Sequence, residues 1–437
     1  MNMKNIIKKI IPESLLQIRR NYLEKKNAAA QKRLIEEQAQ RHQVNLQRLQ
    51  GKEKIKVAFF AIHSSVWKYD YLYRLMVEHP KFEPIIVVCP VVNYGMENML
   101  QEMDKCYQMF HSRNYNVIRA YNVESKEYLD VKKEINPDII FYTNPYKGLI
   151  DDRYYITNFP DTLTCYVSYN YGNSCLYDMF HNLPMHNLVW RLYAETEYHQ
   201  AYSQKYAYNK GKNVVVTGYP GVDVFMDNSY MPYDIWKIKD ANLKRIIWAP
   251  HHTIGVNEVI SYSCFIKYAT FMLDMAKKYQ DKIQLAFKPH PLLRAKLNLC
   301  WGEEETTQYY DAWKDLPNGM LVDADYVDLF LTSDSMIHDS GSFITEYLYT
   351  NNPVMRTDNG IDLSKEFNSF ALDCLSVYYH GKNEEDIENF INDVISDNDP
   401  LKNERKEFLN QRLLPPNNKL ASLNILDDIL KSTNSLA

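Results

Sequence analysis

The feature that most constrains the fold is the alternation of short, continuously apolar runs with stretches of helical spacing. The pattern begins with "KIKVAFFAI" (54–62) and continues with "EPIIVVCP" (83–90) after a helical stretch. Two more apolar runs follow, "NVIRAY" (116–121) and "PDIIFYT" (137–143). Apolar runs without polar alternation predict strands that are covered on both faces. Strands that alternate with helices predict a parallel sheet with right-handed crossovers.

The same alternation resumes after residue 240, where strands are predicted at 243–250, 281–291, 319–323, 334–339 and near 353–356. We therefore predict an α/β protein in which two Rossmann-like domains face each other across a cleft, with a basic helical arm before them. A length of 437 residues also favours two domains over one core. The expected divisions are 1–54 for the arm, 55–230 for the first domain, 231–400 for the second and 401–437 for terminal helices.

The arm is defined by its charge. Residues 1–54 carry a net charge of +8, whereas the rest of the chain carries −13. Ile6, Ile7 and Ile10 recur at helical spacing among lysines, which is typical of a basic amphipathic helix on an anionic membrane surface. A helix that packs on the protein itself, or a short coiled coil, explains the pattern equally well. The apolar stripe thins over residues 28–50, which predicts a solvated helix there.

The overall composition excludes several classes of protein. Hydrophobic residues make up 46% of the chain and charged residues 24%, which excludes general disorder and lacks the basic balance of a nucleic-acid-binding protein. The seven cysteines are scattered without a CxxC pair, so neither a zinc site nor a disulfide framework is expected. No Asp-x-Asp ligand motif stands out, and we predict no metal and no cofactor. Apolar runs are too short to cross a bilayer and no signal peptide is evident, so a cytoplasmic protein is expected.

One turn stands out for its residue types. "MIHDSGSFITEYLY" (336–349) reads as a strand, a turn and a helix. A helix start offers free N–H groups to an anion, and Gly341 lets the backbone approach a phosphate closely. Ser340 and Ser342 add hydroxyl donors, and the Glu346 carboxylate is placed to accept hydrogen bonds from two ribose hydroxyls. The alternative is that Ser342 only caps the helix and Glu346 is an exposed helix residue.

Two other strand ends carry similar side chains. "WAPHHT" ends a strand with His251 and His252, and "FKPHP" ends the next strand with Lys288 and His290. Together with Asp339 at the start of the serine-rich turn, these residues would line one edge of the second sheet. Polar groups that converge at such an edge predict a diphosphate-binding site.

These motifs resemble the successive signatures of the CDP-glycerol glycerophosphotransferase family, the teichoic-acid primases and polymerases. "VTGYPGVDVF" (216–225) and the closing "NKLASLNILDDIL" are also similar to family segments, so that the resemblance covers roughly residues 137–432. It implies a GT-B fold whose carboxyl-terminal domain holds CDP-glycerol or a related nucleotide donor. It also implies a lipid-linked saccharide or polyol-phosphate acceptor, at the inner face of the cell membrane.

The resemblance also implies roles for single residues. His290 would contact the diphosphate, Ser340 and Ser342 would cradle it, and His251 or His252 would occupy the opposite rim. An acceptor hydroxyl would attack the phosphorus nearer the glycerol and expel CMP. Cationic and N–H donors around both phosphates would then be the main catalytic requirement.

The chain departs from the family at two positions. Where the family has a Trp-His-Gly histidine that resembles a general base, this chain has Tyr171 in "VSYNYGNS". A tyrosine of ordinary pKa is a poor base at neutral pH. His63, in "AIHSSVW" after the first strand, and His181 are the other candidates; His63 is favoured by its place at a strand end, although a structural turn histidine fits equally well. Gly221 stands where the family has an arginine, which removes one phosphate contact.

The predicted function is therefore the transfer of glycerol phosphate, or another polyol phosphate, in the synthesis of a cell-surface polymer. A nucleotide-sugar glycosyltransferase with the same serine-rich turn is an alternative within the transferases. A catalytically silent GT-B scaffold in a capsule-assembly complex is an alternative of another class, motivated by the missing histidine.

Overall fold

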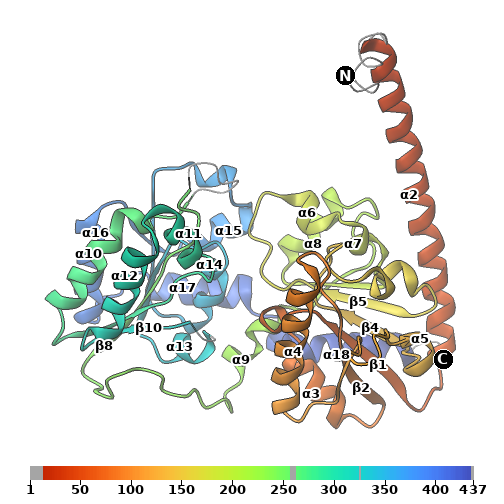
Figure 1. Cartoon of the computed structure of the whole chain (residues 1–437), viewed down its shortest axis with the longest axis horizontal. Helices are drawn as coiled ribbons and strands as arrows, with labels where there is room; N and C mark the ends of the chain where they lie inside the picture. The colour runs from red at the N-terminus through yellow and green to blue at the C-terminus, as the bar shows by residue number, and fades with distance from the viewer. Residues whose placement is uncertain (1–12, 256–261, 324–325, 435–437) are drawn as a thin grey trace. The chain divides into compact units, whose positions relative to one another are not determined.

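The computed structural model describes residues 13–255, 262–323 and 326–434, and they form two compact units (Figure 1). Unit 1 comprises Met1–Tyr169, Asp178–Val216 and Ile425–Ala437, and unit 2 comprises Asn170–Tyr177 and Thr217–Asn424. Residues 170–177, which the sequence places in the first domain, thus group with the second sheet. Seven free cysteines are distributed over the two units.

Unit 1 is built on a parallel sheet of seven strands in the order β3-β2-β1-β4-β5-β6-β7. The strands are β1 (Ile55–Ala61), β2 (Phe82–Val88), β3 (Val117–Arg119), β4 (Ile139–Tyr142), β5 (Leu163–Val167), β6 (Arg191–Ala194) and β7 (Val214–Val216). Residues 57–61 of β1 are completely buried, as expected for a central strand covered on both faces.

Helices flank this sheet (Figure 1). They are η1 (Ser64–Val66), α3 (Asp70–Glu78), α4 (Gly95–Ser112), α5 (Val131–Glu134), η2 (Asp152–Tyr154), η3 (Ile156–Asn158), α7 (Pro184–Leu188) and α8 (Glu197–Tyr206). Two further helices, α6 (Tyr177–His181) and α18 (Ala421–Asn434), include residues of both units.

The arm forms one long helix, α2 (Glu13–Leu49), whose second half packs on unit 1. Gln38, His42, Asn45 and Leu49 are buried at helical spacing, and the Gln38 and Asn45 amides donate to the carbonyl of Pro160. The prediction of a solvated helix over residues 28–50 is therefore wrong from Gln38 onward, where three polar side chains and Leu49 form a buried stripe. The isoleucines of the predicted membrane face lie outside the described residues.

Unit 2 repeats the architecture with a parallel sheet of six strands in the order β10-β9-β8-β11-β12-β13. The strands are β8 (Lys244–Ala249), β9 (Ile283–Phe287), β10 (Gly319–Leu321), β11 (Ser335–His338), β12 (Val354–Thr357) and β13 (Tyr379–Gly381). The α-helices are α9 (Asp223–Met226), α10 (Phe265–Lys278), α11 (Leu293–Cys300), α12 (Glu303–Asp315), α13 (Val327–Leu331), α14 (Phe343–Glu346), α15 (Ser369–Leu375), α16 (Glu384–Ile395) and α17 (Lys402–Phe408). Shorter turns are η4 (Pro220–Val222), η5 (Tyr347–Thr350), η6 (Leu363–Lys365), η7 (Leu409–Leu413) and η8 (Pro416–Asn418).

The predicted α/β class with two parallel sheets is confirmed. In each sheet the strand order reverses beside the first strand, between β1 and β4 in unit 1 and between β8 and β11 in unit 2. Ligands of open α/β sheets bind outside the carboxyl ends of the strands at such a reversal. Within the described residues, no helix combines the length and hydropathy that a bilayer crossing requires.

Candidate functional site

The predicted site residues of unit 2 follow three adjacent strands. His251 and His252 follow β8, Lys288 and His290 follow β9, and the turn that begins at Asp339 follows β11. These strands are neighbours in the order β9-β8-β11, and all are parallel, so their carboxyl ends share one edge of the sheet. The reversal of strand order therefore lies at the centre of the group.

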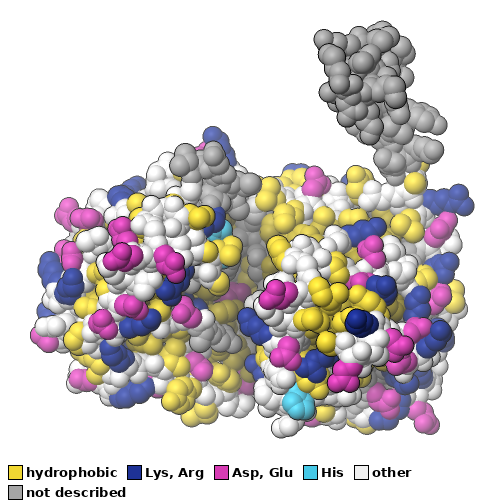
Figure 2. All heavy atoms as spheres, in the orientation of Figure 1, with side chains coloured by type: hydrophobic (Ala, Val, Ile, Leu, Met, Phe, Trp, Pro, Cys, Tyr) yellow, Lys and Arg dark blue, Asp and Glu magenta, His cyan; other side chains and the backbone are white. Residues whose placement is uncertain are grey.

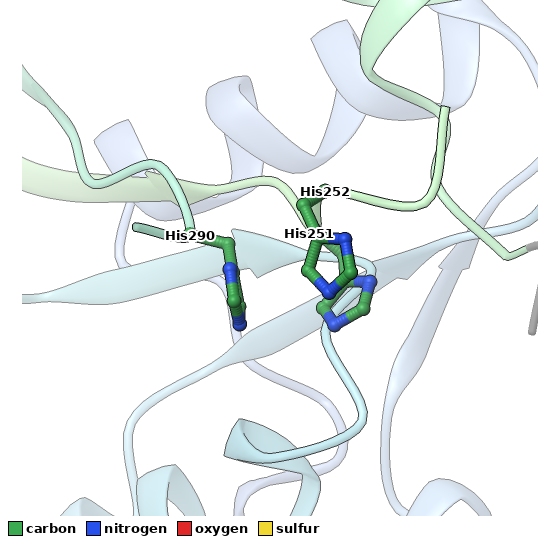
Figure 3. Close-up of side chains that lie close together, drawn as sticks. All are labelled: His251, His252 and His290. Carbon is green, nitrogen blue, oxygen red and sulfur yellow. The ribbon is translucent and has the colours of Figure 1, made fainter. Parts of the chain in front are cut away.

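Three histidine rings meet at this edge, and Figure 3 shows them side by side. The ring centres of His251 and His252 are 4.2 Å apart, and that of His290 lies 4.9 Å from the first and 4.2 Å from the second. One nitrogen from each ring lies within 4.8 Å of the others. The predicted convergence of these histidines is present in the structure.

Burial keeps two of these rings neutral at physiological pH. It lowers the pKa of His251 to about 2, helped by His252, His290, Lys296 and Arg356. Burial likewise lowers the pKa of His290 to about 4, with nearby positive charge adding to the effect. Desolvation and neighbouring cations both disfavour a protonated imidazole. These two rings are therefore hydrogen-bonding groups rather than fixed cations at neutral pH.

The tautomer of His290 is set by the backbone. The N–H of Leu292 donates to His290 Nδ1 over 3.1 Å, so the neutral ring carries its proton on Nε2. An Nε2–H group donates to an anion and has no lone pair for a metal ion. Although three imidazoles can form a zinc site, this hydrogen bond makes His290 better suited to an anionic ligand.

Asp339 positions the histidine cluster through hydrogen bonds to the backbone. Its side chain is buried, and its two carboxylate oxygens accept the backbone N–H groups of His251 and Cys264, each over 2.5 Å. Burial raises the pKa of Asp339 to about 6, against the opposing effect of these N–H groups. The carboxylate is thus occupied by the β8–α10 loop, where it positions His251.

Steric crowding explains why position 341 in the turn is a glycine. A Cβ at Gly341 would lie 2.8 Å from the Tyr262 hydroxyl oxygen and 3.3 Å from the ring of Phe367. The Tyr262 ring centre in turn lies 4.8 Å from that of His251. Any larger residue at position 341 would therefore force the Tyr262 side chain, a neighbour of His251, to shift.

The helix after the turn is shorter than predicted. Helix α14 covers one turn and continues as the 3₁₀ turn η5, so the helix dipole contributes less than expected at this point. Ser342 is exposed, has helical backbone angles and makes no capping hydrogen bond, while its N–H donates to the hydroxyl of buried Ser340. Glu346 is only 4% exposed. The alternative of a capping serine and an exposed glutamate is therefore wrong.

Arg356, at the end of β12, is a site residue that the sequence analysis missed. It is completely buried, it donates from Nη1 to the carbonyl of Asp339 over 3.1 Å, and its Nε lies 3.3 Å from Asp358 Oδ1. Its Nη2 has no hydrogen-bond partner among the described residues. The only signal was an arginine at a strand end in "PVMRTD", which also fits an ordinary surface cation. On the face drawn in Figure 2, positive and negative side chains are interspersed.

Tyr171 and its neighbours belong to the packing of unit 2. The hydroxyl groups of Tyr171 and Tyr349 are hydrogen-bonded over 2.8 Å, and Tyr171 is 2% exposed. Nearby, the Asn173 amide donates to the carbonyl of Gly341 over 2.9 Å. This segment therefore supports the glycine turn through Asn173, and its tyrosine lacks the exposure of a catalytic base.

The two remaining candidate histidines lie in unit 1. His63 is partly exposed and its Nδ1 lies 2.7 Å from Glu102 Oε2. His181 is buried beside Ser203, and burial lowers its pKa to about 3. His63 is thus partly exposed and paired with a carboxylate, whereas His181 is part of the packed interior.

A match to a protein-family sequence model shows the family of this chain. The model described as CDP-glycerol:poly(glycerophosphate) glycerophosphotransferase matches residues 182–431, more than half of the chain. The chain belongs to this family. The glycerophosphotransferase is thus an enzyme of CDP-glycerol-dependent glycerophosphate transfer in teichoic-acid-like polymer synthesis, as predicted.

Solved structures agree with this at the level of the fold. The wall teichoic acid polymerase TagF is 14% identical, with a TM-score of 0.58 over 96% of this chain and 98% of the other. The UDP-GlcNAc 2-epimerase from Neisseria meningitidis is also 14% identical, with a TM-score of 0.54 over 86% of this chain and 100% of the other. No curated protein sequence matches significantly. Both neighbours share the fold, and neither alone assigns the glycerophosphotransferase a substrate.

Proposed function

We propose that the histidine cluster of unit 2 binds the diphosphate of CDP-glycerol. His290 would donate from Nε2–H to a phosphate oxygen, and Lys288 would add positive charge at the same strand end. His251 and His252 would complete the rim, and the hydroxyl groups of Ser340 and Ser342 would donate to the other phosphate. Hydrogen bonds to an ionised group are stronger than neutral ones, which suits this set of donors.

The observation that carries the proposal is the surplus of donors at one strand edge. His290 presents a fixed N–H, and Arg356, which donates to the carbonyl of Asp339, has a terminal nitrogen without a partner among the described residues. Buried polar groups are normally satisfied, so an unmatched donor indicates a missing acceptor. A diphosphate supplies several acceptor oxygens and the matching charge. A structure of TagF soaked with CDPG supports this class of ligand for a protein of the same fold.

In the proposed reaction, a hydroxyl oxygen of the acceptor bonds to the phosphorus that carries the glycerol. The bond from that phosphorus to the oxygen bridging the two phosphates breaks, and the bridging oxygen keeps the electron pair and leaves as part of CMP. The product is a phosphodiester. Donors that hold the leaving phosphate stabilise the charge that develops on it. Glu346, although buried, stays our candidate for the ribose hydroxyls.

We also propose that the acceptor is a lipid-linked saccharide or polyol phosphate at the inner face of the cell membrane, and that the basic arm binds that anionic surface. Its charge of +8 over residues 1–54 supports this. Because Gln38 and Asn45 pack on unit 1, the test should remove only residues 1–28. The truncated protein should unfold like the full chain but no longer sediment with phosphatidylglycerol vesicles. Unchanged sedimentation would remove the arm from the proposal.

The donor is tested by calorimetric titration with CDP-glycerol, UDP-GlcNAc and CMP, together with an assay for CMP release. We expect CDP-glycerol to bind and to be consumed when glycerol 3-phosphate or an oligosaccharide is added as acceptor. UDP release from UDP-GlcNAc would support a glycosyltransferase instead. Binding of CDP-glycerol without turnover on any acceptor would point to a scaffold.

A further inference from the structure

A row of polar side chains crosses the sheet of unit 2 next to the histidine cluster. Arg356 on β12 is the register partner of His338 on β11 and of His380 on β13. Asp358, just after β12, contacts both Arg356 and His380. Arg356 is completely buried, whereas the His380 side chain is 37% exposed. The row therefore connects a buried cation beside the donor site to a titratable group at the surface.

Hydrogen bonds on both sides of the His380 ring define its protonation state. Its Nδ1 lies 2.8 Å from Asp358 Oδ2, and its Nε2 lies 3.2 Å from the carbonyl oxygen of Leu375 at the end of α15. A carbonyl and an ionised carboxylate only accept hydrogen bonds, so both ring nitrogens carry protons. The hydrogen bond to Asp358 raises the pKa of His380, against the effect of burial. The geometry is that of an imidazolium ion.

The Asp358 carboxylate is thus shared between two cations. Its Oδ2 makes the hydrogen bond to His380, while its Oδ1 lies 3.3 Å from Arg356 Nε in an ion pair without a well-formed hydrogen bond. One negative charge therefore faces two positive charges, and the three groups together carry a net charge of +1. If His380 lost its proton, Asp358 would cancel the charge of Arg356.

The charge of Arg356 reaches the histidine cluster. Burial and then Arg356 lower the pKa of His338 to about 3. Arg356 also adds to the lowering of the pKa of His251, after burial and the nearer cluster residues. The guanidinium lies 5.5 Å from the ring centre of Tyr262, which in turn lies 4.8 Å from that of His251. Water does not screen a buried charge, so its field extends over such distances.

We propose that Asp358 and His380 are positioning residues of the donor site, in which protonated His380 engages Asp358 and leaves the charge of Arg356 available to the diphosphate. The inference rests on the proposed function, because it concerns the affinity of that same site for its donor. It makes donor binding depend on pH. Below the pKa of His380 the row carries +1 and attracts the anion; above it the net charge is zero and the attraction is lost.

The test is calorimetric titration of the full chain with CDP-glycerol at pH 7.0 and pH 9.0. Asp339, whose pKa is about 6, stays ionised over this range and does not contribute. The wild type should bind roughly five- to tenfold more weakly at pH 9.0, the effect of one unit charge acting through the protein interior. The groups that act on His380 are Asp358 and Arg356 from the β12 side and the Leu375 carbonyl from α15.

Two conservative variants should change the affinity in opposite directions. His380→Gln leaves Asp358 to cancel Arg356, so it should bind at both pH values as weakly as the wild type does at pH 9.0. Asp358→Asn keeps the shape but removes the negative charge, so at pH 9.0 it should bind roughly five- to tenfold more tightly than the wild type. Lys382→Gln is the matched control, because it removes an exposed cation from the same strand end. Solvent screens that charge, and the control should follow the wild-type pH dependence.

A purely structural role for the pair predicts a different pattern. If Asp358 only held Arg356 in place, Asp358→Asn would weaken binding at both pH values, as His380→Gln does. That result would overturn the inference, and so would a wild-type affinity that is equal at pH 7.0 and pH 9.0. In both cases CDP-glycerol still binds, so the proposed function stands. If the wild type does not bind CDP-glycerol at either pH, the proposed function itself fails and this inference falls with it.

Discussion

The two sheets have the same strand order around their first strands but present opposite chemistry at the carboxyl end of those strands. In unit 2, His251 follows β8, and burial, helped by neighbouring histidines and cations, lowers its pKa to about 2. In unit 1, His63 follows β1 and faces the carboxylate of Glu102. The same position in one fold thus holds a neutral hydrogen-bonding imidazole in one case and a carboxylate-paired imidazole in the other. The difference shows that burial and neighbouring charges, rather than the strand end itself, decide what a histidine can do.

The largest expected effect is that of acid, which should lower the free energy of unfolding of both units. Burial lowers the pKa of three described histidines in each unit to between about 2 and about 4; these are His42, His181, His186, His251, His290 and His338. Below the ordinary pKa of 6.5 the unfolded chain binds protons that the folded chain does not, so the free energy of unfolding should fall as the pH drops from about 6.5 to about 4.

Two buried carboxyls oppose this trend. Burial raises the pKa of Asp223 and Asp339 to about 6, so the folded chain binds protons there first and gains stability on acidification. Because the histidines outnumber them, the net effect should be a loss of stability. Urea unfolding at pH 7.0 and pH 4.5 measures it, and hydrogen exchange reports on each unit. An equal or higher urea midpoint at pH 4.5 than at pH 7.0 would show that the buried histidines do not determine how the free energy of unfolding depends on pH.

Removal of one cluster member should be the next largest effect. His290→Ala removes the Nε2–H donor and should weaken CDP-glycerol binding roughly 10- to 100-fold, as expected for a lost hydrogen bond to a charged group. His79→Ala is the matched control, because His79 Nδ1 accepts the N–H of Lys81 in the same local contact. The control should bind the donor like the wild type. If the wild type and both variants bind CDP-glycerol with equal affinity in calorimetry, the histidine cluster does not bind the donor.

The glycine of the turn should respond more modestly. In Gly341→Ala the added Cβ meets Tyr262, and such overpacking costs about 1–3 kcal/mol of unfolding free energy. Ser342→Ala, at the exposed neighbouring position, should leave the unfolding free energy unchanged. Thermal and urea unfolding give both values. A wild-type stability for Gly341→Ala would mean that Tyr262 moves aside without cost.

The smallest effect is expected for Tyr171, and it sharpens the comparison with His63. Tyr171→Phe loses the hydrogen bond to Tyr349 and should cost about 1 kcal/mol of unfolding free energy. Its kcat should stay within twofold of wild type, as roughly expected for a residue that takes no part in proton transfer. A large fall in kcat with an unchanged free energy of unfolding would show that Tyr171 takes part in catalysis.

Much of the site was predictable because strand ends are visible in a sequence. "WAPHHT" and "FKPHP" placed His251, His252 and His290 at one sheet edge, since the carboxyl ends of adjacent parallel strands coincide. The apolar runs predict four strands of unit 1 but not β5, β6 and β7, of which β6 and β7 have only four and three residues. The spacing of "SKEYLDVKKEI" (125–135) predicts a helix as well, but this stretch contains only the four-residue α5, and Tyr128 forms a bridge with Tyr121.

The sequence by itself determined the two parallel sheets, because a buried strand must be apolar along its length and this pattern is local. It also determined which polar side chains reach the edge of the second sheet. Only the tertiary structure decided that Gln38, His42 and Asn45 form a buried stripe, and that Arg356 is buried with a hydrogen bond to the carbonyl of Asp339. Only the tertiary structure paired His63 with Glu102 as well. Each of these depends on a partner distant in the chain, and the burial and charge that such a partner brings leave no periodic trace in either segment.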